Sequence, residues 1–283
     1  MKRRRMCECL IIINFFKDGI QMYINNGKIL EQTRFPSPNP NVELTVITYL
    51  SNGLRVKGML AAPIGDEPMD GFLYLRGGIK NVGKVRPARI SQFAAEGFIV
   101  FAPYYRGNQG GEGNEDFAGE DREDAYAAFL LLKSLSRVRD IHIFGFSRGG
   151  VMALLTGLQF PEAASVVTWG GVSDMTLTYK ERKDLRRMMK RVIGGTPEKF
   201  PERYQERTPL YQLERLAAPV LIIHGVKDHN VSVEHAYRLE RRLRSLEKPV
   251  DGWYFSEFTH YFPPAENRKV VEDLSKWMKN QSR

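Results

Sequence analysis

The sequence predicts an α/β protein with a mostly parallel central sheet and helices on both faces of that sheet. The chain has 283 residues and a hydrophobic content of 42%, which suits one large domain with a substantial core. Short apolar runs alternate with helical stretches through most of the chain. Apolar runs of this length, separated by helices, are typical of parallel strands buried on both faces.

The predicted sheet begins with an antiparallel hairpin. Val42–Tyr49 alternates between apolar and polar residues, and Leu54–Pro63 follows a Ser-Asn-Gly turn. The proline-rich residues 36–40 form an extended segment before the hairpin. We therefore divide the chain into an N-terminal extension, residues 1–41, and a single domain, residues 42–283.

The remaining strands and helices are expected to alternate along the chain. The apolar runs that predict strands are Gly71–Leu75, Phe98–Ala102, Ile141–Phe146, Ser165–Trp169, Pro219–His224 and, more weakly, Val250–Phe255. The stretches that predict helices are Ala88–Glu96, Glu120–Leu135, Gly149–Leu158, Val233–Leu246 and Asn267–Lys279.

One long segment interrupts this alternation. Residues 174–215 are highly charged and lack a strand-like run, and Gly194-Gly195-Thr196-Pro197 marks a helix end followed by a turn. We expect this segment to form a small helical cap-like insertion beside the sheet.

Composition argues against several classes of protein. The formal net charge is +9 and is concentrated at Lys2–Arg5, Arg182–Arg191 and Arg241–Arg244. We interpret these as solvated basic faces, because no zinc-finger spacing or RNA-binding aromatic signature indicates a nucleic-acid partner. Binding of nucleic acid through Arg182–Arg191 stays as a minor alternative. Oligomeric state cannot be read from these features.

The N-terminal residues bear on the compartment. Lys2–Arg5 and the apolar stretch Cys9–Phe16 imitate a signal peptide, but no small-residue cleavage site follows, and the stretch is too short to span a bilayer. We expect no membrane partner, and a native start at Met22. Cys7 and Cys9 are the only cysteines, and we interpret them as free thiols in a reducing cytoplasm.

The strongest chemical motif is Gly145-Phe146-Ser147-Arg148-Gly149-Gly150, a G-x-S-x-G sequence between a predicted strand and a predicted helix. This arrangement places a serine on a sharp turn, where small neighbours avoid clashes and the hydroxyl stands at the positive end of the helix. It predicts the nucleophile elbow of the α/β-hydrolase fold. A glycine-rich helix start with a capping serine is the alternative interpretation.

A serine nucleophile needs a base and an orienting carboxylate, in the chain order serine, acid, histidine. Among five histidines, His260 follows the last predicted strand and precedes the last helix, so its loop can overhang the carboxyl edge of the sheet. We favour Asp228, in the loop after the strand Pro219–His224, as the acid, with Asp174 as the alternative. A buried structural histidine and a turn-capping aspartate are the competing interpretations.

Two backbone N–H groups are expected to stabilise the oxyanion. The elbow supplies that of Arg148, and Gly78 supplies the second from the loop after the strand Gly71–Leu75. Tyr105 and Arg106 end a strand near the site. Arg106 either clamps a substrate carboxylate or braces its own loop.

Several motifs together resemble the catalytic domain of the prolyl oligopeptidase family of serine peptidases, from about Val42 to the C-terminus. They are the elbow at 145–150, the loop 102–110 with its Tyr-Arg-Gly, the acidic helix start at 119–124, the segment 194–209, and the region from His224-Gly225 through Asp228 to Val231. The resemblance implies catalytic Ser147, Asp228 and His260, and an oxyanion site formed by Gly78 and Arg148.

The chain also departs from the family pattern in four ways. Arg76 replaces the usual histidine or tyrosine before the two glycines, Thr259 replaces the glycine before the base, and Ser232 replaces a proline. Arg76 therefore joins Tyr105 and Arg106 as a candidate substrate-binding residue. Fewer than 45 residues precede the predicted domain, so the family's N-terminal β-propeller is not expected.

The expected activity is hydrolysis by acyl transfer, without a metal or organic cofactor. The resemblance favours a peptidase that acts on short peptides, and the expected lack of a propeller equally suits a carboxylesterase that acts on small acyl esters. A hydrolase-like binding protein without turnover is the third possibility.

Overall fold

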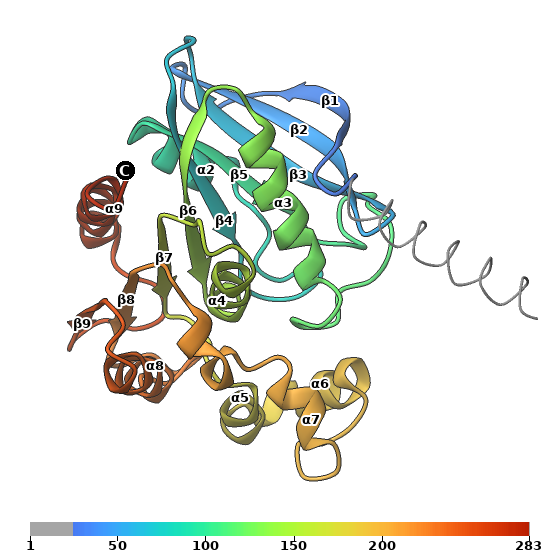
Figure 1. The fold of residues 1–283 in the computed structure, drawn as a ribbon, viewed down its shortest axis with the longest axis vertical. Coiled ribbons are helices and arrows are strands. Elements are labelled where there is room, and N and C mark those ends of the chain that lie inside the picture. The colour runs from blue at the N-terminus through green and yellow to red at the C-terminus, as the bar shows by residue number, and fades with distance from the viewer. Residues whose placement is uncertain (1–24, 283) are drawn as a thin grey trace, which may run out of the picture.

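The computed structural model describes residues 25–282, and a nine-stranded sheet runs through them in the order β1-β2-β3-β5-β4-β6-β7-β8-β9 (Figure 1). The first three strands are antiparallel to their neighbours; they are β1 (Ile29–Phe35), β2 (Val42–Ser51) and β3 (Leu54–Pro63). The other six are mutually parallel; they are β4 (Met69–Leu75), β5 (Phe98–Pro103), β6 (Val138–Phe146), β7 (Ser165–Trp169), β8 (Val220–Gly225) and β9 (Val250–Phe255).

Helices cover both faces of the sheet, which confirms the predicted fold class. On one face, α2 (Pro87–Ala95) and α9 (Pro264–Lys279) pack over an aromatic core that includes Phe72, Phe93 and Phe144. On the other face lie α3 (Arg122–Ser134), α4 (Gly149–Gln159) and α8 (Glu234–Ser245). Because successive side chains of a strand point to opposite faces, each parallel strand contributes to both cores.

The register of the parallel strands brings their carboxyl ends to one edge. Leu75 of β4 lies beside Gly145 of β6, Phe146 of β6 beside Trp169 of β7, and Gly225 of β8 beside Phe255 of β9. The loops that follow these strands therefore meet, and such an edge is where open α/β sheets place their sites.

The segment predicted as a cap contains only helical elements and loops. Its helices are α5 (Met175–Glu181), α6 (Arg186–Ile193) and α7 (Pro201–Gln205), with short 3₁₀ turns at Lys183–Leu185, Pro209–Tyr211 and Leu213–Arg215. Gly194 caps the C-terminus of α6 with a left-handed φ of 90°. Figure 1 shows α5, α6 and α7 grouped together, apart from the helices that cover the sheet.

The sheet begins earlier than the sequence indicated. Residues 29–35, assigned above to an N-terminal extension, form edge strand β1 and pair with β2 from Ile29↔Tyr49 to Phe35↔Leu44. Its side chains are partly or fully exposed, so the strand shows no apolar alternation. The predictions about Lys2–Arg5, Cys7, Cys9, Cys9–Phe16 and Met22 lie outside the described residues. Between residues 25 and 282, no helix is long and apolar enough to cross a membrane.

Candidate active site

Ser147 occupies a strained turn directly between β6 and α4. Its φ is 58°, a left-handed value that is uncommon for residues other than glycine. The backbone N–H of Ser147 donates to the Trp169 carbonyl at 3.1 Å, and the Val172 N–H donates to the Ser147 carbonyl at 2.9 Å. The loop after β7 thus holds this turn from both sides.

The glycines of the elbow are required because other backbone segments touch them. A Cβ atom on Gly145 would lie 2.0 Å from the Gly149 carbonyl oxygen, and one on Gly149 would lie 2.0 Å from the Leu75 carbonyl oxygen. A Cβ on Gly150 would lie 2.6 Å from the Cα of Gly171. Real Cβ atoms do not approach backbone this closely, so only glycine allows α4 to start against β4 and the β7 loop.

His260 and Asp228 form a direct side-chain pair at the same edge. His260 Nδ1 lies 2.6 Å from Asp228 Oδ2, and both residues are buried. The other oxygen, Asp228 Oδ1, accepts the backbone N–H groups of Asn230 and Val231 at 2.8 and 3.0 Å. Burial alone would raise the pKa of Asp228, but the hydrogen bond and charge of His260 and these backbone donors hold it below its ordinary value. The carboxylate is therefore ionised at neutral pH.

The serine turn and this pair are brought together by contacts between adjoining loops. The ring of Phe146, the residue before Ser147, lies 4.8 Å from the His260 imidazole, centroid to centroid. A Cβ on Gly170 would lie 3.2 Å from His260 Nδ1 and 3.3 Å from Asp228 Oδ2. Gly170 in turn follows Trp169, which accepts the N–H of Ser147. The ends of β6, β7, β8 and β9 thus gather the three predicted residues in one place.

The loop after β4 packs directly against the serine. A Cβ on Gly77 would lie 2.6 Å from the Cβ of Ser147 and 3.2 Å from its Oγ. Gly78 follows in a left-handed conformation, with a φ of 66°, that the nearby Val82 carbonyl would deny to a larger residue. The glycine pair therefore brings bare backbone to the serine, as an oxyanion site needs.

Arg76 and Tyr105, which were predicted to bind substrate, are both buried. The Tyr105 ring is buried beside two guanidinium groups, with the Cζ of Arg76 5.0 Å and that of Arg148 4.8 Å from its centroid. Both arginines bond Oε1 of buried Glu115, at 3.0 Å from Arg76 and 2.6 Å from Arg148. Arg148 also pairs with Asp121 at 2.8 Å, so two buried carboxylates balance the two guanidinium charges.

Arg106 also turns inward, which favours the second of the two roles considered for it. Its side chain is 7% exposed and pairs at 3.0 Å with Asp124, which is 0% exposed. The backbone N–H of Arg106 donates to the same carboxylate at 2.6 Å. Arg106 therefore braces its own loop and is not placed as a clamp for a substrate carboxylate.

The alternative acid, Asp174, serves a local role away from His260. It caps α5 by accepting the Leu177 N–H at 2.9 Å, and it pairs with Arg238 at 2.8 Å. Two further histidines are structural. His224 Nε2 donates to the Val231 carbonyl at 2.9 Å. His235 is 1% exposed, and its Nδ1 accepts the N–H of Ser173 at 3.2 Å.

Several residues of this region were not singled out from the sequence. Gly170 follows a predicted strand, and a glycine at a strand end can indicate a close backbone approach. Glu115 carried no comparable signal, because its partners are far away in the chain, and Asp121 was noted only as part of the acidic helix start at 119–124. Among residues 25–282, no group of three or more His, Cys, Asp or Glu side chains is arranged to hold a metal ion.

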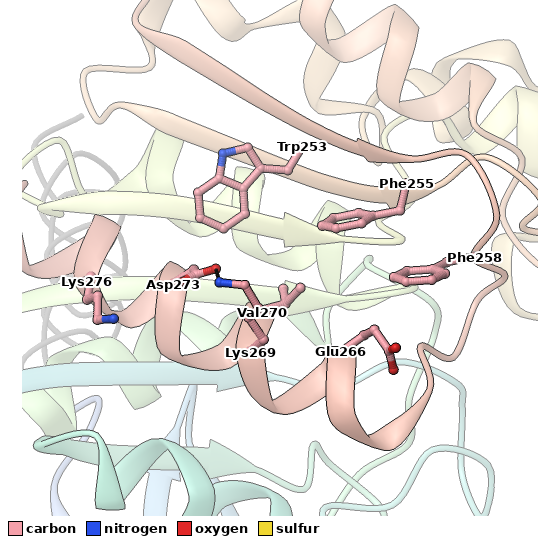
Figure 2. A pocket seen from close by; sticks show the side chains of 8 residues that line it. All are labelled: Trp253, Phe255, Phe258, Glu266, Lys269, Val270, Asp273 and Lys276. Carbon is pink, nitrogen blue, oxygen red and sulfur yellow. Dashed lines mark hydrogen bonds and ion pairs between the residues drawn. The ribbon is translucent and has the colours of Figure 1, made fainter.

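A separate hollow of about 340 Å³ lies between β9 and α9 (Figure 2). Trp253 and Phe255 of β9, Phe258 of the following loop and Val270 of α9 provide its apolar lining, and charged side chains of α9 surround it. Phe258 precedes His260 by two residues, so the hollow adjoins the histidine loop without including Ser147 or Asp228.

Comparisons with known proteins identify the family. Residues 84–283 match the model of the prolyl oligopeptidase family. The chain is 66% identical over 256 residues to the uncharacterized peptidase YtmA of Bacillus subtilis, covering 89% of this chain and 100% of that protein. It is 28% identical over 129 residues to esterase LipC of Mycobacterium tuberculosis, covering 40% of this chain and 32% of that one.

The fold has matches among solved structures as well. A puromycin-hydrolyzing peptidase of Mycobacterium tuberculosis superposes with a TM-score of 0.72 at 20% identity, over 89% of this chain and 45% of that chain. This chain thus spans less than half of that protein. The family match, the relatives and the α/β-hydrolase architecture lead to one conclusion: the chain belongs to the prolyl oligopeptidase family and is a serine hydrolase.

Proposed function

We propose that Ser147, His260 and Asp228 form the catalytic triad of this hydrolase, with short peptides as the principal substrates. The observation that carries the proposal is the 2.6 Å hydrogen bond between His260 Nδ1 and Asp228 Oδ2, beside a serine in a left-handed turn. This bond leaves Nε2 as the imidazole nitrogen available to the serine hydroxyl.

In the proposed reaction, His260 Nε2 accepts the Ser147 proton while Oγ attacks the carbonyl carbon of the substrate. The resulting imidazolium then donates that proton to the leaving amine or alcohol, and the acyl group stays on Ser147. Water, deprotonated by the same nitrogen, releases the acid product and restores the serine. Asp228 holds the imidazole tautomer and stabilises the imidazolium, and it does not accept the proton. No cofactor is required.

The oxyanion of each tetrahedral intermediate is proposed to bind the backbone N–H groups of Arg148 and Gly78. Arg148 is the N-cap residue of α4, and Gly78 belongs to the glycine pair packed on Ser147. Donors fixed in this way stabilise charge that develops only in the transition state.

Peptide substrates are supported by the close relative, whose name describes it as a peptidase. Ester hydrolysis is the second candidate, supported by the partial match to an esterase. Both reactions use the same acyl-enzyme, but an ester needs less assistance to its leaving group. We also propose the reducing cytoplasm as the compartment, on the basis of the low cysteine content alone.

The test is covalent labelling by a fluorophosphonate probe, combined with a substrate panel. Ser147→Ala should abolish labelling, whereas Ser165→Ala should retain it. Ser165 is a matched control because its hydroxyl lies 2.8 Å from Nδ1 of another histidine, His142. Persistent labelling of Ser147→Ala would refute the nucleophile assignment. Turnover of aminoacyl and prolyl amides is then compared with turnover of short acyl esters, which distinguishes a peptidase from an esterase. A protein that turns over neither class would favour the hydrolase-like binding protein.

A further inference from the structure

We infer that Glu115 is a positioning residue. It links the two backbone segments that carry the oxyanion donors, and in this way it fixes the geometry of the oxyanion site. This inference rests on the proposed function, because it assumes that the Arg148 and Gly78 N–H groups receive the oxyanion. Glu115 acts through these segments and is not proposed to meet Ser147 or substrate.

The carboxylate of Glu115 bonds to both segments at once. Its Oε1 accepts Nη2 of Arg148, the residue after the serine, at 2.6 Å and Nη2 of Arg76, the residue before the glycine pair, at 3.0 Å. Its Oε2 accepts the backbone N–H of Lys80, just beyond the glycine pair, at 2.5 Å. The elbow and the glycine loop therefore share one anchor.

The anchor is fully buried and strongly charged. The side chain of Glu115 is 0% exposed, and those of Arg76 and Arg148 are 3% and 2% exposed. Burial would raise the pKa of Glu115, but Arg148 and Arg76 hold it below its ordinary value, so it stays ionised. A second carboxylate, Asp121, accepts Nη1 of Arg148 at 2.8 Å. The charges in this cluster balance, and each arginine is held in one orientation.

The loop that carries Glu115 is strained in a way that places this carboxylate. Tyr105, Gln109, Phe117 and Ala118 all have φ between 52° and 67°, in the left-handed region. A residue other than glycine persists in this region only where its surroundings impose it. Asn108 of the same loop donates to Glu115 Oε2 at 3.0 Å. The backbone conformation of the loop and the bond from Asn108 thus both help to place the Glu115 carboxylate.

Two arginines beside an oxyanion site could also bring positive charge to it, but here the charge of each arginine is paired with buried carboxylates. Arg148 directs Nη1 to Asp121 and Nη2 to Glu115, and Arg76 directs Nη2 to Glu115 and to the Tyr104 carbonyl. What reaches the serine from these segments is backbone. The contribution of Glu115 is therefore geometric: it holds two N–H groups at a fixed separation, which determines how well they stabilise the transition state.

The test compares Glu115→Gln and Glu115→Leu with a matched control, Asp70→Asn. Asp70 is a 5% exposed carboxylate near the opposite end of β4, bonded to Ser282 at 2.7 Å, so its loss also removes a buried acid. For each variant, kcat and KM are measured on an ester and normalised to the concentration of serine titrated by the phosphonate. Affinity for a trifluoromethyl ketone is measured in parallel, because addition of Ser147 Oγ to this ketone places a negative oxygen in the oxyanion site.

Losing one oxyanion donor typically lowers kcat about 10²–10³-fold. We expect kcat per titrated serine to fall about tenfold in Glu115→Gln and about 100-fold in Glu115→Leu, with KM within about threefold of wild type. Ketone affinity should fall by the same factor as kcat/KM. Asp70→Asn should lower thermal stability but keep kcat, KM and ketone affinity.

A milder variant keeps the test decisive if Glu115→Leu does not fold. Asn108→Ala removes one partly buried donor to Glu115 and should lower kcat about two- to fivefold, with ketone affinity following. Unchanged kcat per titrated serine in Glu115→Gln and Asn108→Ala, in an active wild type, would overturn the role of Glu115 alone. A wild type with no turnover and no labelling at Ser147 would instead overturn the proposed function.

Discussion

The Nδ1 atom of His260 lies 2.6 Å from Oδ2 of Asp228, although 32 residues separate them in the chain. The contact exists because β8 and β9 are parallel neighbours whose following loops turn toward each other. A Cβ on Gly225 would lie 2.4 Å from the Phe258 carbonyl oxygen, so the histidine loop crosses directly over the end of β8. This crossing sets the imidazole against the acid.

The first prediction concerns which aspartate orients the base. Asp228→Asn should lower kcat on the order of 10³–10⁴-fold with little change in KM, because the amide cannot hold the same tautomer or stabilise the imidazolium. Steady-state kinetics on an ester checks this. Asp174→Ala is the control: it should cost about 0.5–2 kcal/mol of stability by removing the cap of α5 and leave kcat unchanged. Equal losses of kcat in both variants would contradict the assignment.

The second prediction concerns Arg106. Arg106→Met should lower the free energy of unfolding by about 3–5 kcal/mol, because it leaves the buried carboxylate of Asp124 without its partner. The ratio of KM values for peptides with a free and an amidated C-terminus should stay as in wild type. Urea unfolding and paired kinetics measure the two effects. The control is Arg55→Met, which breaks the ion pair between Arg55, whose side chain is 48% exposed, and Glu31. This change should lower the free energy of unfolding by less than about 1 kcal/mol. A KM increase confined to carboxylate substrates would restore Arg106 as a clamp.

The third prediction tests the packing of the elbow. Gly149→Ala should destabilise the protein by more than about 3 kcal/mol or prevent folding, because the new Cβ would meet the Leu75 carbonyl oxygen at 2.0 Å. Gly157→Ala, on the same helix, would meet Val166 Cγ2 at 2.7 Å and Leu216 Cδ1 at 3.0 Å, and these side chains can yield more easily than a backbone carbonyl. Its cost is offset by about 1 kcal/mol of helix propensity. Thermal unfolding of both variants should show a much larger loss for Gly149→Ala, and similar losses would argue against so close an approach of α4 to β4.

The fourth prediction concerns pH. Burial, opposed by Arg148, raises the pKa of Asp121 from 3.8 to about 6. Between these values the folded state binds more protons at this site than the unfolded state, so ionisation of Asp121 lowers stability as pH rises through the window. Relative to Asp121→Asn, the wild-type free energy of unfolding should therefore fall by on the order of 1–3 kcal/mol from about pH 4 to about pH 6. Urea unfolding at several pH values measures this, and a constant difference would contradict it.

Much of the fold followed from local patterns. The bounds of β7 agree with the apolar run Ser165–Trp169, because a short parallel strand buried between helices consists almost entirely of apolar residues. The bounds of β9 agree with Val250–Phe255, although this strand lies at the edge of the sheet and is only partly buried. Strand β1 was missed for the opposite reason. An edge strand with exposed side chains can be polar throughout, and its pairing with β2 depends on backbone hydrogen bonds that leave no pattern in the sequence.

The residues of the candidate site also divide into those that could be selected from the sequence and those whose role could not be predicted from it. Ser147, Asp228 and His260 could be selected because a strand end positions each of them. The roles of Arg76 and Arg106 could not, since an arginine in a loop is as suitable for substrate as for an internal acid. Their partners, Glu115 and Asp124, lie 39 and 18 residues away and are identified only when the loops are folded.

The most direct test of the triad is a crystal structure of the protein inactivated by a small phosphonate. We predict one adduct, on Oγ of Ser147, with His260 Nε2 within hydrogen-bonding distance of an adduct oxygen and Nδ1 still bonded to Asp228. An adduct on another residue, or an imidazole of His260 turned away from a modified Ser147, would contradict the account.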